Sequence, residues 1–330
     1  MRAKQARAGK PGQKTLKPKP QKPSAKMEMG VASQASGGLL ANAQKDARPL
    51  AYSDLDVSKW RDYQDIEIGS LWQFDARERK NGHQLDYHGN CVPQILTQLL
   101  TRFTKSEDVV LDLFLGSGTS AIEAANLGRK AIGVELKEEM ADYVRQKLAE
   151  QGKSSIAEII QGDSSQQVKT KKAIEKALLK LNSKNKQSNN VDKAQFLFLH
   201  PPYADIIRFS ELPNDLSNAA DTEAFLDQFE AVCRLGYECL EPGRFAAVVI
   251  GDKYSAGELI PLGFYCMDRM NRVGFKTKSI IVKNITGNEK AKGRMNNLWR
   301  YRALVGGFYL FKHEYVLVFQ KPVKESKLRK

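Results

Sequence analysis

The 330-residue chain has few cysteines and no long apolar run. Its four cysteines, at Cys91, Cys233, Cys239 and Cys266, form no C-x-x-C pair, which argues against a zinc site and is typical of a reducing compartment. No stretch of about 18 apolar residues is present, so we expect no membrane-spanning helix. The N-terminus also lacks the apolar stretch of a secretory signal. These absences predict a cytoplasmic protein without a bound metal.

Positive charge is concentrated near the N-terminus. Residues 1–50 hold eleven Lys and Arg against two acids, which is +9 of the chain's net charge of +14. Residues 1–27 add Pro, Gly and Gln with almost no apolar side chains, so burial cannot offset chain entropy there. We predict a disordered basic tail over 1–49, which either adds salt-dependent affinity for a polyphosphate or only aids solubility.

From about residue 105 onward, short apolar segments rich in β-formers alternate with helical patterns. Strands buried on both faces read as continuous apolar runs, as VVLDLF, FLFL and FAAVVI do. The alternation predicts an α/β fold with a seven-stranded, doubly wound, Rossmann-like sheet. Strands are expected at Val109–Phe114, Lys130–Leu136, Ala157–Asp163, Ala194–His200, Phe245–Asp252, Lys278–Lys283 and His313–Gln320, and helices at Thr119–Leu127, Lys137–Gln151, Thr222–Leu240 and Leu259–Val273.

Two insertions interrupt the alternation. Residues 168–193 predict a basic amphipathic helix followed by a polar loop. Residues 284–312 show no strand pattern but interleave basic and aromatic side chains, which suit phosphate contacts and base stacking; the alternative is a surface loop without that role. The expected organisation is the basic tail over 1–49, a small N-terminal cap over 50–87, the main domain over 88–322 with insertions at 168–193 and 284–312, and a basic C-terminal tail over 323–330.

The first predicted strand runs into a glycine turn, Asp112-Leu-Phe-Leu-Gly116-Ser-Gly118-Thr-Ser-Ala121. Glycines let the backbone turn tightly and approach a ligand between strand and helix. The same spacing occurs in nicotinamide-dinucleotide turns and alone is a weak signal. Asp112 favours a different ligand, because a carboxylate inside the strand end costs free energy without a partner. The positive ammonium and sulfonium of S-adenosylmethionine would supply one.

Two further carboxylates end the neighbouring strands. Glu135 ends the second strand, where it can accept hydrogen bonds from both ribose hydroxyls. Asp163 ends the third strand, in place to accept the adenine amino group. Each acid alone is also compatible with a solvated strand end. Together they indicate a ligand site, because such sheets bind ligands at the carboxyl ends of their strands.

The fourth strand ends in His200-Pro201-Pro202-Tyr203. Consecutive prolines fix φ and remove two backbone donors, which produces a rigid extended exit from the sheet. The carbonyl between His200 and Pro201 is then a fixed acceptor, and Tyr203 offers a flat face for an unstacked base. Elsewhere in a chain, the same residues are typical of a turn or a linker.

These paired motifs resemble those of the DNA amino-methyltransferases, which make N6-methyladenine or N4-methylcytosine. That family combines F-x-G-x-G with [DNS]-P-P-[YFW], and this chain carries FLGSGTS from Phe114 and HPPY from His200. HEYVLVFQK at 313–321 resembles the family's last strand, and HGNCVPQILTQLLTRF at 88–103 resembles the helix that closes over the methionine part of the cofactor. The resemblance covers about residues 85–321 and implies a methyltransferase sheet with its last strand antiparallel.

The resemblance implies an S-adenosylmethionine-dependent DNA methyltransferase, specific for adenine N6 or cytosine N4, that acts on a flipped base. Acceptors at the first motif position and the following carbonyl would draw the amino nitrogen towards sp³, so that it attacks the sulfonium methyl in line. His200 departs from the usual Asp, Asn or Ser, and a protonated imidazole accepts no hydrogen bond. We therefore predict that activity is lost below about pH 6, and the base stays open.

Three sets of candidate site residues follow from the motifs and the resemblance. The catalytic set is His200, Pro201, Pro202 and Tyr203. The cofactor set is Asn90, Asp112, Phe114, Gly116, Ser117, Gly118, Thr119, Glu135 and Asp163. Nucleic-acid contacts are expected from Arg208, Arg294, Trp299, Arg300 and Arg302.

Other functions stay open. RNA base methyltransferases and a protein-glutamine methyltransferase also use P-P-Y motifs. A nicotinamide-dependent oxidoreductase would account for Gly116, Gly118 and Glu135, but not for the P-P-Y strand end. A non-catalytic nucleic-acid-binding protein would account for the basic segments but not for the acids around the glycine turn. A degenerate enzyme that binds the cofactor without turnover is a further alternative, because His200 departs from the family motif. DNA is the preferred partner, association with the nucleoid is expected, and the sequence identifies no partner restriction nuclease.

Overall fold

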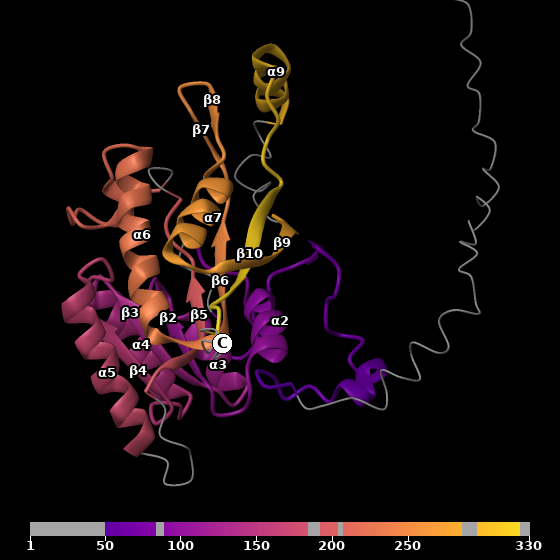
Figure 1. Cartoon of the computed structure of the whole chain (residues 1–330). Helices are drawn as coiled ribbons and strands as arrows, with labels where there is room; N and C mark the ends of the chain where they lie inside the picture. The colour runs from indigo at the N-terminus through magenta and orange to yellow at the C-terminus, as the bar shows by residue number, and fades with distance from the viewer. Residues whose placement is uncertain (1–49, 84–88, 184–191, 204–206, 286–295, 324–330) are drawn as a thin grey trace, which may run out of the picture. The chain divides into compact units, whose positions relative to one another are not determined.

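The structure is a computed structural model that describes residues 50–83, 89–183, 192–203, 207–285 and 296–323 (Figure 1). These residues belong to one unit, Arg48–Lys330. The basic tail predicted over 1–49 lies outside the described residues, as does all of the predicted C-terminal tail except residue 323.

A mixed eight-stranded sheet forms the centre of the fold. Its strands are β1 (Leu71–Trp72), β2 (Val109–Asp112), β3 (Lys130–Glu135), β4 (Ala157–Gln161), β5 (Ala194–Leu199), β6 (Leu240–Ile250), β9 (Lys276–Asn284) and β10 (His313–Gln320). The order is β1-β9-β10-β6-β5-β2-β3-β4. The strands from β4 to β6 are mutually parallel, and β10 runs antiparallel between β6 and β9. The seven predicted strands and the antiparallel last strand are confirmed.

Three short elements differ from the predictions. β1 pairs in parallel with β9, and Trp72 is buried beside it, although a two-residue strand is too short to show periodicity. The hairpin of β7 (Lys253–Ser255) and β8 (Glu258–Ile260) follows β6. The helix predicted from Leu259 therefore begins at Leu262, because residues 258–260 pair with β7 and Pro261 precedes the first turn.

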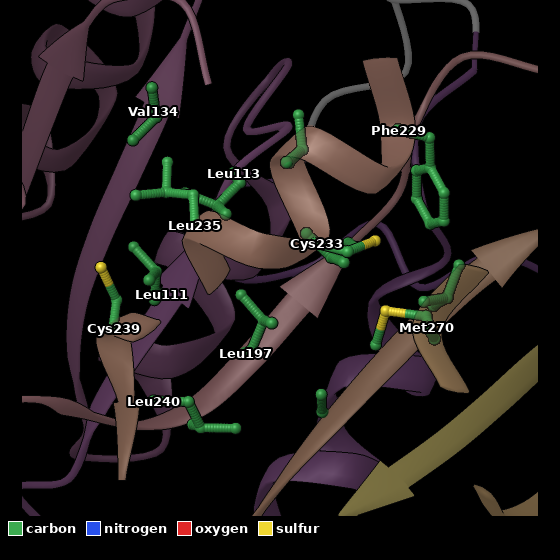
Figure 2. Close-up of a cluster of buried hydrophobic side chains, with 14 of the residues drawn as sticks. Leu111, Leu113, Val134, Leu197, Phe229, Cys233, Leu235, Cys239, Leu240 and Met270 are labelled. Carbon is green, nitrogen blue, oxygen red and sulfur yellow. The ribbon is translucent and has the colours of Figure 1, made fainter. Parts of the chain in front are cut away.

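Helices cover both faces of the sheet, as a doubly wound fold requires. They are α2 (Pro93–Phe103), α3 (Thr119–Asn126), α4 (Glu138–Glu150), α5 (Gln167–Ser183), α6 (Thr222–Cys239) and α7 (Leu262–Val273). Successive strand residues point to opposite faces, so Leu111 packs with α5, α6 and α7 whereas Val110 packs with α2, α3 and α4. Figure 2 shows the first cluster, where Leu197 of β5 lies among side chains of α6 such as Cys233. Each fully buried Leu or Phe side chain stabilises the folded state by about 1.5–3 kcal/mol relative to an exposed one.

Two glycines allow the turn after β2 to pack closely. Gly118 precedes α3 with φ 81°, and a Cβ there would lie 2.6 Å from Val144 of α4. A Cβ on Gly133 of β3 would lie 2.5 Å from Leu115, which follows β2. The glycine turn therefore fits between its neighbours only with hydrogen at these two positions.

Each insertion contains one helix within its described residues. Residues predicted as a basic amphipathic helix form α5, which buries Ile174, Leu178 and Leu181 against the sheet. Residues 296–306 form α9 (Asn296–Gly306), which extends beyond the same end of the sheet as the β7–β8 hairpin (Figure 1). In the described part of the chain, no helix combines the length and apolar character needed to cross a membrane.

Candidate active site

A cavity of about 810 Å³ lies along the carboxyl edge of the parallel strands. Residues that end or directly follow β2, β3, β4, β5 and β6 all line it. β10 contributes from its first residues, because an antiparallel strand begins at the edge where its parallel neighbours end. The volume is within the usual range for small-molecule sites, about 300–1,000 Å³, and the location is where open α/β sheets bind ligands.

The cavity brings together most of the predicted cofactor and catalytic residues. His200, Pro201, Pro202 and Tyr203 line it, and so do eight of the nine predicted cofactor residues: Asn90, Asp112, Phe114, Gly116, Ser117, Thr119, Glu135 and Asp163. Gly118 does not line it. Its left-handed backbone instead starts helix α3, so it shapes the turn without facing the cavity.

Glu135 ties the glycine turn to the end of β3. One carboxylate oxygen accepts a hydrogen bond from the Gly116 amide at 2.8 Å, and the other accepts from the Lys137 amide at 3.0 Å. Burial raises the pKa of this carboxyl above its ordinary value. Because each oxygen has a further lone pair, the carboxylate can still accept bonds from a ligand.

Asp112 already has partners inside the turn. Its carboxylate accepts hydrogen bonds from the Phe114 amide, at 2.8 Å, and from the Ser120 hydroxyl. Burial raises its pKa to about 7. These two hydrogen bonds offset only part of the cost of burying the carboxylate, since its pKa stays raised, so a cationic partner from the cofactor stays a prediction. Asp112 still lines the cavity, so its contact with the cofactor stays a prediction.

Asn90 and Asp163 are held by residues far away in sequence. The Asn90 amide oxygen accepts from the Ser117 hydroxyl, and Arg77 donates to the Asn90 carbonyl at 3.1 Å. Asp163 accepts from the Asn214 amide at 2.8 Å. The residues before α2 and the segment after β5 therefore both anchor groups at the rim of the cavity.

The His-Pro-Pro-Tyr segment contacts a buried ion pair. The Tyr203 hydroxyl donates to Glu314 at 2.7 Å, and the Lys283 ammonium donates to the other Glu314 oxygen at 2.9 Å. His200 Nε2 lies 3.5 Å from the Tyr203 hydroxyl oxygen. A Cβ on Gly251 would lie 3.0 Å from the Tyr203 ring, so the backbone that follows β6 packs closely against this ring.

Burial and the ion pair between Lys283 and Glu314 determine the protonation states of His200 and Glu314. Burial lowers the pKa of His200 below 6.5, although the Glu314 carboxylate opposes the shift. Burial alone would raise the pKa of Glu314, but the Lys283 ammonium, His200 and Tyr203 outweigh it and lower the pKa. At neutral pH the imidazole is therefore neutral and Glu314 is ionised.

Sequence reasoning missed Glu314, Lys283 and Arg77. Glu314 lies within the HEYVLVFQK motif, but an acid at the start of a strand has no distinctive signal there. Its pairing with Lys283 depends on the register between β9 and β10, which places these two residues opposite each other. Arg77 lies in an irregular segment without periodicity, so its hydrogen bond to the Asn90 carbonyl could not be predicted from the sequence.

The predicted nucleic-acid contacts that the structure describes do not line the cavity. Arg208 is exposed and pairs with Glu211 at 2.6 Å. Trp299, Arg300 and Arg302 lie on α9, where the Arg302 guanidinium sits 5.3 Å from the centre of the Trp299 ring system. Arg294 lies outside the described residues.

The segments that flank α9 reach the cavity. Ile285 and Phe311, at the two ends of the insertion, line it. The Phe311 ring stacks on Tyr254 of the β7–β8 hairpin with ring centres 5.0 Å apart. Within the described residues, no cluster of three His, Cys, Asp or Glu side chains could hold a metal ion.

The strand order, the antiparallel β10 and the cavity at the carboxyl edge define a Rossmann-like methyltransferase fold. Residues 10–146 match the model of the N6/N4 DNA methylase family. This match confirms, for that part of the chain, the resemblance to the DNA amino-methyltransferases. It includes the glycine turn and Glu135 but ends before Asp163 and the His-Pro-Pro-Tyr segment.

Individual relatives are similar over shorter stretches. The type II methyltransferase M1.MboII of Moraxella bovis is 37% identical over 83 residues, 24% of this chain and 31% of that protein. M.BglII of Bacillus subtilis is 34% identical over 83 residues, 24% of this chain and 22% of that protein. Among solved structures, TrmN from Thermus thermophilus matches 70% of this chain and 49% of its own at 16% identity, with a TM-score of 0.43. The chain thus spans under a third of the length of these two curated relatives.

Proposed function

We propose that this protein transfers a methyl group from S-adenosylmethionine to the exocyclic amino nitrogen of adenine or cytosine in DNA. The observation that carries the proposal is one cavity lined by the glycine turn, by Glu135 and by His200-Pro201-Pro202-Tyr203. Because the cofactor turn and the amino-group motif lie at one edge of the sheet, the methyl donor and the base amino group could meet there. The match to the DNA methylase family supports the choice of DNA.

The cavity suits a cofactor with a ribose and a positive charge. Glu135 and Asp163 both line the cavity. In the proposed complex, Glu135 would accept from the ribose hydroxyls and Asp163 from the adenine amino group. Asn90 and Asp112 offer oxygen acceptors beside the turn, which itself holds no basic side chain for a phosphate. When bound, S-adenosylmethionine would supply a methyl group whose bond to sulfur breaks, with its electron pair going to sulfur, as the bond to the base nitrogen forms.

The His-Pro-Pro-Tyr segment would prepare the base nitrogen for this reaction. A ring amino nitrogen is a poor nucleophile because its lone pair is delocalised. The His200 carbonyl, fixed by the following proline, and the neutral His200 ring can accept its two N–H hydrogen bonds. Tyr203 offers its ring to the flipped base, which partly offsets the unstacking cost of a few kcal/mol.

The decisive experiment combines labelled S-adenosylmethionine with duplex DNA or bulk RNA, followed by nucleoside mass spectrometry. We expect N6-methyladenine or N4-methylcytosine in the DNA sample. Label in RNA alone would establish an RNA base methyltransferase instead. Calorimetric binding of S-adenosylmethionine without transfer to either polymer would indicate a non-catalytic binding protein, and binding of NAD in its place would contradict the proposed cofactor.

We also propose that α9 and the residues before it contact the DNA backbone. Replacing Arg294, Arg300 and Arg302 together with alanine should weaken DNA binding and reduce its salt dependence, by about 0.9 in the log–log slope for each phosphate that is no longer neutralised. Fluorescence anisotropy at several salt concentrations measures both. The matched control replaces Arg145, Arg234 and Arg272, which lie on α4, α6 and α7 and pair with acids of their own helices. Equal slopes for the two triple variants would refute this interface.

A further inference from the structure

Four side chains at the cavity form a continuous polar chain: Lys283 of β9, Glu314 of β10, Tyr203 and His200. Lys283 and Glu314 are largely removed from solvent, with side chains 5% and 13% exposed. The chain ends at His200, the residue that departs from the family motif. The contact between His200 Nε2 and the Tyr203 oxygen is long, at 3.5 Å, as catalytic hydrogen bonds often are before substrate binds.

The direction of each hydrogen bond follows from the number of protons available. Ionised Glu314 can only accept, so Lys283 donates to one oxygen and Tyr203 must donate its single hydroxyl proton to the other. The Tyr203 oxygen then has only lone pairs left to offer His200. A hydrogen bond across that contact therefore requires the imidazole to donate through Nε2–H. A neutral imidazole carries one ring proton, so Nδ1 is left as an acceptor.

We propose that Glu314 and Tyr203 are positioning residues that hold His200 in the Nε2–H tautomer, so that Nδ1 accepts a hydrogen bond from the amino group of the target base. This role in catalysis rests on the proposed function, whereas the tautomer does not. His200 lines the cavity, and Nδ1 has no hydrogen-bond partner among the described residues. The tautomer explains how an imidazole can replace Asp, Asn or Ser, because Nδ1 offers one fixed lone pair to the substrate.

The same nitrogen can receive the proton that the reaction releases. As the nitrogen–carbon bond forms, the amino nitrogen must lose one proton, and Nδ1 can take it to give an imidazolium. Of the charged groups that face His200, Glu314 would stabilise this cation, whereas Lys283 and Arg77 would oppose it. Since burial also opposes it, the proton would pass on to solvent after transfer.

The tautomer is measurable without cofactor or DNA. The chain has four histidines, His83, His88, His200 and His313, so ¹⁵N-histidine labelling gives few ring signals, and His200→Asn identifies those of His200. At neutral pH we expect a protonated Nε2 and an unprotonated Nδ1. Tyr203→Phe keeps the ring but removes the hydroxyl, and it should produce a mixture of both tautomers. An Nδ1–H tautomer in the wild-type protein, or an unchanged Nε2–H signal in Tyr203→Phe, would overturn the proposal.

Kinetics then test whether the tautomer matters for catalysis. Glu314→Gln no longer forces the direction of the Tyr203 proton. It should lower kcat by up to about 10²-fold, the lower end of what a positioned acid–base group contributes. The same change in a His200→Asn background should cost much less, because an amide oxygen accepts without a tautomer. Equal losses in the two backgrounds would show that Glu314 is only structural and would refute the catalytic role.

The proposed function and the proposed tautomer of His200 can fail separately. If the wild-type protein methylates neither DNA nor RNA, the proposed function fails while the NMR result still decides the tautomer. If methylation occurs and the tautomer is wrong, the proposed function stands and the positioning role falls.

Discussion

Replacing His200 with alanine is expected to lower kcat for DNA methylation by about 10²–10⁴-fold, because the amino group loses an acceptor that positions it for attack. His200→Asn restores an acceptor of the kind usual at this motif position and should recover much of the loss. Initial rates at saturating cofactor and DNA measure both variants. Alanine and asparagine variants of equal activity would contradict an acceptor role for the side chain.

If the proposed activity holds, the wild-type protein should also lose kcat as the pH falls, because only the neutral imidazole accepts a hydrogen bond. Burial lowers the pKa of His200, so the midpoint should lie below 6.5 and the neutral form should dominate above it. Asp112, with a pKa raised to about 7, titrates in a similar range but should affect cofactor KM more than kcat. The kcat profile of His200→Asn should therefore lack this decline at low pH. A midpoint above 6.5, or an unchanged decline in His200→Asn, would assign it to another group.

Replacing Glu135 with alanine is expected to weaken S-adenosylmethionine binding about 100-fold. The change removes the proposed ribose acceptor and also leaves the Gly116 and Lys137 amides without their partner. Losses of about 1.5–3 kcal/mol for a charged hydrogen-bond partner are consistent with this factor. Isothermal titration calorimetry with the folded variant measures it.

The matched control for Glu135→Ala is Glu139→Ala. Glu139 lies in the first turn of α4, is exposed and does not line the cavity. It should leave the affinity within about twofold, since surface changes away from special features have small effects. Similar affinities for the two variants would contradict the placement of the ribose at β3.

Sequence patterns were sufficient for seven of the eight strands of the sheet and for the strand-end residues of the candidate site. Apolar runs such as VVLDLF marked strands buried on both faces, and their alternation with helical segments implied a doubly wound sheet. Once strands are parallel, their carboxyl ends share one edge. For this reason Asp112, Glu135, Asp163 and His200 could be grouped from their positions at strand ends, and all four line one cavity.

Local patterns failed where partners are set by long-range packing. The two-residue β1 and the three-residue strands of the β7–β8 hairpin are too short to show a period, and pairing with distant or adjacent chain creates them. The strand-end position of Asp112 suggested a ligand as its partner, and it gave no sign that Ser120 and the Phe114 amide also bind the carboxylate. A residue's chemistry suggests that it needs a partner, but only the folded chain shows which one it has.

By itself, the sequence determined the fold, the glycine turn and the His-Pro-Pro-Tyr strand end, because periodicity and backbone restriction are local properties of a chain. Tertiary structure alone decided what surrounds His200. Lys283 and Glu314 lie opposite each other only in the register of β9 and β10, and they reach Tyr203 only because an antiparallel strand begins where its parallel neighbours end. Cross-strand register depends on the packing of the whole sheet, which no short stretch of sequence specifies.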